Sequence, residues 1–153
     1  MSQQSMVNQI VQKLQTNANV LGYAQNIGNA IVDGPANHCA ATLSALLVFA
    51  GIYPNSINTS TGNLDPWVPT LVADLQMNLH WNKISVVDGF VSGDVGVVML
   101  DTIHHVYLVV DATDQAMPLI ADNRSPSLHV RAVAGDIQSG WSPTTFFLRA
   151  PSA

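Results

Sequence analysis

Apolar residues recur at helical spacing through the first third of the chain. The first stripe predicts a helix over residues 5–16 and consists of Met6, Val7, Ile10, Val11 and Leu14. A second stripe predicts a helix that ends before Asp33-Gly34-Pro35 and consists of Val20, Ala24, Ile27 and Ile31. We expect both helices to pack these stripes against a common core.

Two further helices are expected before the middle of the chain. Residues 39–50 are apolar on nearly every side and are followed by Gly51, which is typical of a buried helix. Asn37 is the expected N-cap of this helix. A fourth helix is expected to begin with Asp65 as N-cap and Pro66 at its first position, and to end near Met77.

Strand patterns dominate the second half. Valine-rich and aromatic runs between turn residues predict strands at 80–87, 95–100, 105–110, 119–121, 130–133 and 145–148. Helices followed by strands predict an α+β fold, with N-terminal helices packed on a central antiparallel sheet of about five to six strands. We expect one domain over residues 1–153, with an N-terminal helical part at 1–34, a core at 35–148 and a loose tail from Arg149.

The single cysteine of the chain, Cys39, stands in the first turn of the predicted buried helix. Unpaired N–H groups and the positive end of the helix dipole favour a thiolate there, which would make Cys39 a nucleophile. The backbone N–H of Cys39 would be free to bind a developing oxyanion. The alternative is that Cys39 is simply a small buried apolar residue.

Partners for a reactive thiol occur later in the chain. His105 opens a predicted strand, where an imidazole could accept the proton of the thiol and return it to a leaving amine. Asp122 and Asn123 end the next strand, and both could orient an imidazole. The order along the chain is therefore Cys, His, Asp or Asn.

Three short blocks resemble the NlpC/P60 and CHAP group of papain-like cysteine peptidases and amidases. They are the Cys39–Ile52 helix that ends in Ala-Gly-Ile, the Gly93–Val98 block Gly-Asp-Val-Gly-Val-Val, and the His105–Val110 block His-Val-Tyr-Leu-Val-Val. The resemblance implies a papain-like fold in which Cys39 is the nucleophile and His105 the base. It also implies that a polar residue of the following strand, Asp122 or Asn123, orients the histidine.

Neighbouring candidates must be separated, because adjacent residues of a strand face opposite sides of the sheet. The match of His105-Val106 to the His-Val of the family favours His105 over His104. Asp122 could stabilise an imidazolium by charge, whereas Asn123 could only fix the ring by hydrogen bonding. We therefore favour Asp122 and keep Asn123 as the alternative third residue. Arg124 is expected at the surface, with a substrate carboxylate as its alternative partner.

Other histidines and metal chemistry are given no role by the sequence. His80 and His129 are expected to be surface or half-buried residues. Cys39, His104, His105 and Asp122 are metal-ligand types, yet no close pair has the spacing of a zinc motif. We expect neither a metal nor another cofactor.

Composition limits the partners. The net charge is −5 and only five residues are Lys or Arg, which disfavours nucleic acid as a partner. No uninterrupted apolar run reaches the roughly 18 residues of a membrane span. Residues 1–5 lack the pattern of a Sec signal, so we expect synthesis in the cytoplasm. A role outside the cell would require delivery by phage, lysis or a non-Sec route.

These observations predict a cysteine hydrolase, with no metal or cofactor. By resemblance, the expected substrate is an amide bond of bacterial cell-wall peptides (peptidoglycan). Two alternatives stay open: a papain-like acyl transferase of transglutaminase type, and a catalytically inactive binding or structural module on the same scaffold. A protein partner for immunity or delivery also stays open.

Overall fold

Four helices and one antiparallel sheet make up the computed structural model, which describes residues 1–31, 38–53 and 67–153. The helices are α1 (Gln3–Thr16), α2 (Asn19–Ile31), α3 (His38–Phe49) and α4 (Val68–Met77). The strands are β1 (Asn82–Ile84), β2 (Val95–Leu100), β3 (Ile103–Asp111), β4 (Leu119–Ala121), β5 (His129–Val130) and β6 (Phe146–Arg149). The α+β class and the antiparallel sheet are thus confirmed.

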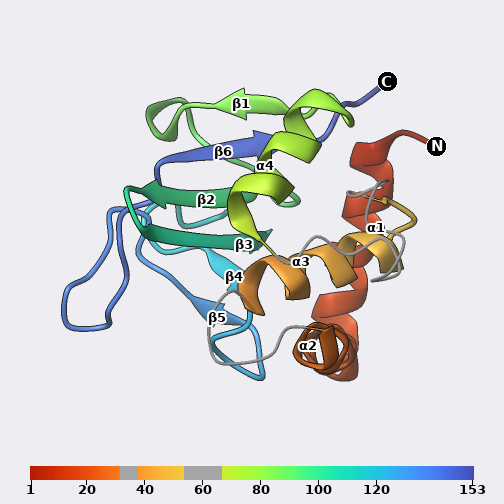
Figure 1. Cartoon of the computed structure of the whole chain (residues 1–153), viewed down its shortest axis with the longest axis horizontal. Coiled ribbons are helices and arrows are strands. Elements are labelled where there is room, and N and C mark those ends of the chain that lie inside the picture. Colours follow the sequence, from red (N-terminus) through yellow and green to blue (C-terminus); the bar gives the residue numbers. More distant parts are fainter. Residues whose placement is uncertain (32–37, 54–66) are drawn as a thin grey trace.

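The sheet has six strands in the order β1-β6-β2-β3-β4-β5. Figure 1 shows α3 and α4 in front of this sheet, and α1, α3 and α4 all contact the central strand β3. Alternation along β3 separates two cores, because successive side chains point to opposite faces. Val106 and Leu108 pack in the core that includes the helices, whereas Tyr107 and Val109 pack on the other face with Phe147.

Two predicted strands are shorter than expected. The 80–87 run forms β1 only at Asn82–Ile84 and then turns into a short 3-10 helix, η2 (Val86–Asp88). The 130–133 run leaves the ladder after Val130. The N–H of Arg131 still donates to the carbonyl of Pro118 at 3.1 Å. Proline has no N–H to donate in return, so regular pairing cannot continue there.

The helix α1 is confirmed, but the buried face of α2 differs from the prediction. Ile27 is 38% exposed, and the residues of α2 that are buried include Leu21, Ala24 and Gly28. A Cβ atom at Gly28 would lie 3.1 Å from the backbone nitrogen of Thr42 in α3. Glycine therefore lets α2 approach the helix that carries Cys39 closely.

The C-terminal tail is held in place, contrary to expectation. Arg149 donates two hydrogen bonds to the buried carboxylate of Asp94, at 3.0 and 2.7 Å. Ala150 is buried, and the carbonyl of Pro151 accepts a hydrogen bond from the backbone N–H of Gln4 at 3.1 Å. These contacts join the two ends of the chain, which lie on the same side of the molecule in Figure 1.

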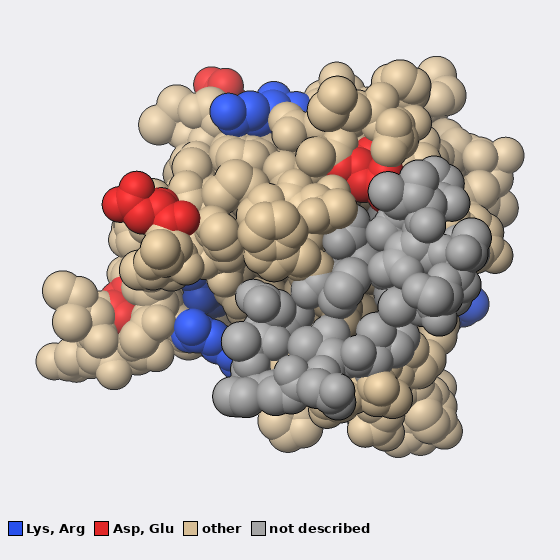
Figure 2. All heavy atoms as spheres, in the orientation of Figure 1, with Lys and Arg blue, Asp and Glu red and all other residues tan. Residues whose placement is uncertain are grey.

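The predicted caps of α3 and α4, Asn37 and Asp65-Pro66, lie outside the described residues. Within the described part, no helix has both the length and the apolar character that crossing a bilayer requires. The face shown in Figure 2 carries only small, separate groups of charged side chains among uncharged ones.

Candidate active site

Cys39 is the second residue of α3 and is 5% exposed. Its side chain belongs to the core between the helices and the sheet. Hydrogen bonding to the side chain of His105 and to the backbone of Val106 and Ala40 lowers the pKa of the thiol. Cys39 is therefore a buried residue, as the alternative interpretation held, but one with polar contacts.

The backbone of β3 explains why the thiol can reach Val106. Val109 exchanges backbone hydrogen bonds of 2.9 and 2.8 Å with Asp94 and Gly93, so its N–H points toward β2. The direction alternates along an antiparallel strand, so the N–H of Val106 points toward β4. However, β4 ends at Ala121, opposite Leu108. The N–H of Val106 lies beyond the end of β4 and has no partner on that strand. The sulfur of Cys39 occupies the position that a further β4 residue would take.

His105 is 7% exposed and contacts two groups. Its Nε2 atom lies 3.0 Å from Oδ2 of Asp122, which is 2% exposed. Because Asp122 holds Nε2, the hydrogen bond with the Cys39 thiol is assigned to Nδ1. The ring lies beside Tyr107, with 6.4 Å between the ring centroids. The structure thus brings Cys39, His105 and Asp122 into one hydrogen-bonded series.

The electrostatics of the series favour a thiolate–imidazolium pair. Burial raises the pKa of the Cys39 thiol, but the hydrogen bond and charge of His105 and the two backbone contacts outweigh it, so the pKa is lowered. Burial likewise lowers the pKa of His105, but Asp122 and Cys39 outweigh it, so the pKa is raised. Both shifts favour transfer of the proton from sulfur to the ring.

Asp122 is held ionised by donors on both oxygens. Oδ2 accepts from His105, and Oδ1 accepts from Nε2 of His129 and the backbone N–H of Arg124, both at 2.9 Å. Burial opposes ionisation, yet these two histidines hold the pKa of Asp122 well below its ordinary value. From α2, Nε2 of Gln25 donates to the backbone carbonyl of Asp122 at 2.8 Å.

His129 was assigned no role in the prediction from the sequence, yet it contacts Asp122. It is paired with Ile120 across β4 and β5, so its side chain lies on the same face of the sheet as Ile120 and Asp122. The signal in the sequence was weak, since β5 has only two residues and its register follows from the connection at 122–128.

The side chains of the other candidates lie around this series without joining it. His104 is half-buried and, by alternation, points away from the face of His105. Arg124 is exposed and its Nη1 donates to the carbonyl of Gly140 at 3.2 Å. Asn123 lines a pocket of about 200 Å³ with Gln25, Asn29 and His38. Its buried Oδ1 has no hydrogen-bond partner among the described residues, so this oxygen does not orient His105.

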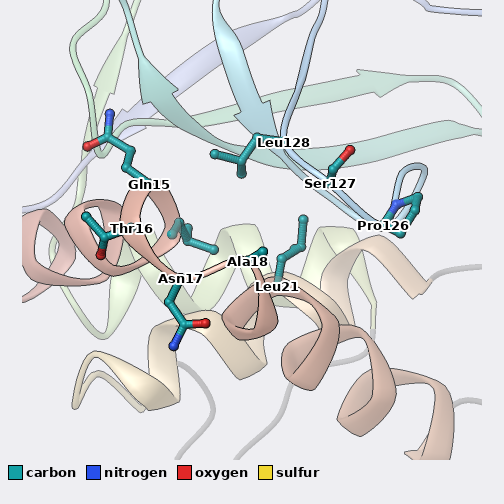
Figure 3. A pocket seen from close by; sticks show the side chains of 9 residues that line it. Gln15, Thr16, Asn17, Ala18, Leu21, Pro126, Ser127 and Leu128 are labelled. Carbon is teal, nitrogen blue, oxygen red and sulfur yellow. The ribbon is translucent and has the colours of Figure 1, made fainter.

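A separate hollow of about 410 Å³ lies away from Cys39. It is formed where the end of α1 and the start of α2 face the connection between β4 and β5 (Figure 3). Its lining includes Leu14, Leu21 and Leu128, and none of the residues of the hydrogen-bonded series. In the described ranges, no group of three or more histidine, cysteine or aspartate side chains has a geometry suited to a metal ion.

Comparisons of the chain with protein-family models, with curated proteins and with solved structures gave no match.

Proposed function

We propose that the protein is a cysteine hydrolase that cleaves amide bonds through Cys39, His105 and Asp122. The observation that supports this proposal best is the 3.0 Å contact between Nε2 of His105 and Asp122. It leaves the other ring nitrogen to Cys39 and fixes the ring, as a third group fixes the base in hydrolytic triads. The proposed papain-like NlpC/P60 fold would account for the same arrangement.

In the proposed reaction, the Cys39 thiolate attacks the carbonyl carbon of the amide and forms a C–S bond. The carbonyl oxygen becomes an oxyanion, for which the backbone N–H of Cys39 in the first turn of α3 is a helix-terminal donor. His105 then gives its Nδ1 proton to the amide nitrogen, the C–N bond breaks and an amine leaves. Water attacks the thioester while His105 accepts a proton, which releases the acid and restores the thiolate.

The proposed substrate is a peptide of the bacterial cell wall. This assignment depends on the resemblance of the Cys39, Gly93 and His105 blocks to NlpC/P60 and CHAP proteins. A pocket near the series is lined by Gln25, Asn29, His38 and Asn123. Two of these residues are sequence neighbours of the series, since His38 precedes Cys39 and Asn123 follows Asp122. In this pocket the buried Oδ1 of Asn123, which has no partner among the described residues, suits a hydrogen bond from a backbone N–H of a peptide.

The proposal is tested by incubating the protein with purified cell walls of several peptide types and measuring the release of new amino groups. We expect release by the wild type and by the His104→Ala variant, and none by Cys39→Ala. If no wall type releases amino groups but an added amine is acylated in a Cys39-dependent manner, the transferase is the better assignment. If neither reaction occurs, the protein is better described as a binding module.

A further inference from the structure

The ring of His129 faces a hydrogen-bond acceptor at each nitrogen. Its Nε2 lies 2.9 Å from Oδ1 of Asp122, and its Nδ1 lies 3.2 Å from the backbone carbonyl oxygen of Val130. A carbonyl and an ionised carboxylate can only accept hydrogen bonds, and a neutral imidazole carries a single N–H. His129 therefore satisfies both contacts only as an imidazolium.

The environment of His129 allows a positive charge. Its side chain is 20% exposed and keeps some contact with solvent. Its ring lies beside Trp141, with 6.2 Å between the ring centroids. Asp122, which is negative, is in direct contact with the ring. Arg124 is exposed, and the guanidinium of the buried Arg131 lies 5.9 Å from the centre of the Trp141 ring.

His105 and His129 thus share one carboxylate from opposite sides. With Cys39 as thiolate, the four groups Cys39, His105, Asp122 and His129 alternate in sign along the hydrogen-bonded series. A carboxylate that serves a second cation stabilises the first less, because the two cations repel each other and compete for the same negative charge.

We propose that His129 is a positioning residue that holds Asp122 and, through its positive charge, lets His105 release its proton at a lower pH than an unshared Asp122 would allow. The proposal rests on the proposed function in taking His105 as the acid that serves the leaving amine. An acid held too firmly by Asp122 would donate its proton poorly, so a second cation on the carboxylate favours that step.

The test compares the wild type with His129→Gln and His129→Lys. NMR chemical shifts of the histidine rings are followed from pH 5 to 10. Glutamine can keep a donor toward Asp122 but removes the charge, whereas lysine keeps a charge. We expect the titration midpoint of His105 to rise by about one pH unit in His129→Gln and to return toward the wild-type value in His129→Lys. The alkaline inflection of Cys39 alkylation by iodoacetamide should move in the same direction.

An unchanged His105 midpoint in a folded His129→Gln variant would overturn the proposal. If that variant does not fold, the protonation of the two ring nitrogens of His129 is measured by NMR in the wild type at pH 7. Protons on both nitrogens support the proposal, and a proton on only one refutes it. Neither measurement needs a substrate. If the shift is observed but no amino groups are released from cell walls, the proposed function is refuted and the proposal about His129 is still supported.

Discussion

Cys39 and His105 come from a helix and a strand that are far apart in the chain, yet hydrogen bonding between their side chains lowers the pKa of the thiol and raises the pKa of the imidazole. They meet where β3 extends past the last residue of β4 and leaves the N–H of Val106 to the sulfur. A short β4 is therefore part of the site, because a longer strand would pair with this segment of β3 and exclude the thiol.

The first prediction concerns the reactivity of the thiol. Because the pKa of Cys39 is lowered, the thiolate persists below the pH at which a free thiol becomes protonated. Alkylation of Cys39 by iodoacetamide at pH 6–7 should be faster than alkylation of a small model thiol of ordinary pKa. Cys39 is 5% exposed, so limited access of the reagent reduces this difference in rate. Mass spectrometry of the alkylated chain gives both rates.

His105→Ala removes the hydrogen bond and the charge that oppose the effect of burial on the thiol. The pKa of Cys39 should then rise, and labelling at pH 6–7 should fall about tenfold or more. The matched control is His104→Ala, the neighbouring histidine on the opposite face, which should label at the wild-type rate. Equal rates in all three proteins would mean that Cys39 is only a packing residue.

The second prediction concerns Asp122→Asn, which preserves shape but removes an acceptor. Both carboxylate oxygens of Asp122 now accept, Oδ2 from His105 and Oδ1 from His129 and the Arg124 N–H. An asparagine would turn its oxygen toward the two donors and its NH₂ toward His105. His105 would then accept at Nε2 and carry its proton on Nδ1, where it cannot take the proton of the thiol.

We therefore expect Asp122→Asn to lower cell-wall hydrolysis by a factor on the order of 10² to 10⁴ while leaving the fold intact. The measurements are initial rates of amino-group release and the circular dichroism spectrum of each variant. His104→Ala is the control, because the side chain of His104 points away from the face of His105. Unimpaired hydrolysis by Asp122→Asn would remove Asp122 from the proposed mechanism.

These contacts also show which parts of the site could be predicted from the sequence. The valine-rich run of β3 and the turn residues before it predict a strand close to its observed bounds, and the motif order points to Cys39, His105 and Asp122. The contact of His129 could not be read in this way, because a strand of two residues has no pattern of its own. Its register depends on the connection that Gln25 of α2 holds through the carbonyls of Asp122 and Ser125.

The buried face of α2 and the tail escaped prediction for a related reason. Ile27 suits a helical stripe, but close contact between α2 and α3 requires Gly28, so the more apolar residue is turned toward solvent. Arg149 and Ala150 look like an exposed end in the sequence. Arg149 is held by Asp94, which is a neighbour only once β2 and β6 pair, and Ala150 after it is buried.

The third prediction concerns acid stability. The pKa of Asp122 is lower in the folded protein than in the unfolded chain, so the unfolded state binds more protons as the pH falls. The stabilising contribution of Asp122 is therefore complete above the ordinary aspartate pKa of about 4 and is lost progressively below it. Urea unfolding should show a stability loss on the order of 1 kcal/mol from pH 5 to pH 3, reduced in Asp122→Asn. An equal loss in both proteins would place the acid sensitivity elsewhere.

The fourth prediction compares two glycines of α2. A Cβ at Gly28 would lie 3.1 Å from the Thr42 nitrogen and 3.2 Å from the Ala41 Cβ, whereas a Cβ at Gly22 would meet nothing within 4 Å. Gly28→Ala must push α2 away from α3, which costs about 1–3 kcal/mol of unfolding free energy. Gly22→Ala should stabilise by up to about 1 kcal/mol through helix propensity.

Because α3 carries Cys39, the displacement in Gly28→Ala should also disturb the contact with His105. We expect slower alkylation of Cys39 at pH 6–7 in Gly28→Ala and an unchanged rate in Gly22→Ala, with thermal unfolding measured in parallel. If Gly28→Ala and Gly22→Ala both stabilise the protein, the interface between α2 and α3 can accommodate an extra methyl group at residue 28. The close approach of α2 would then have no part in placing the thiol.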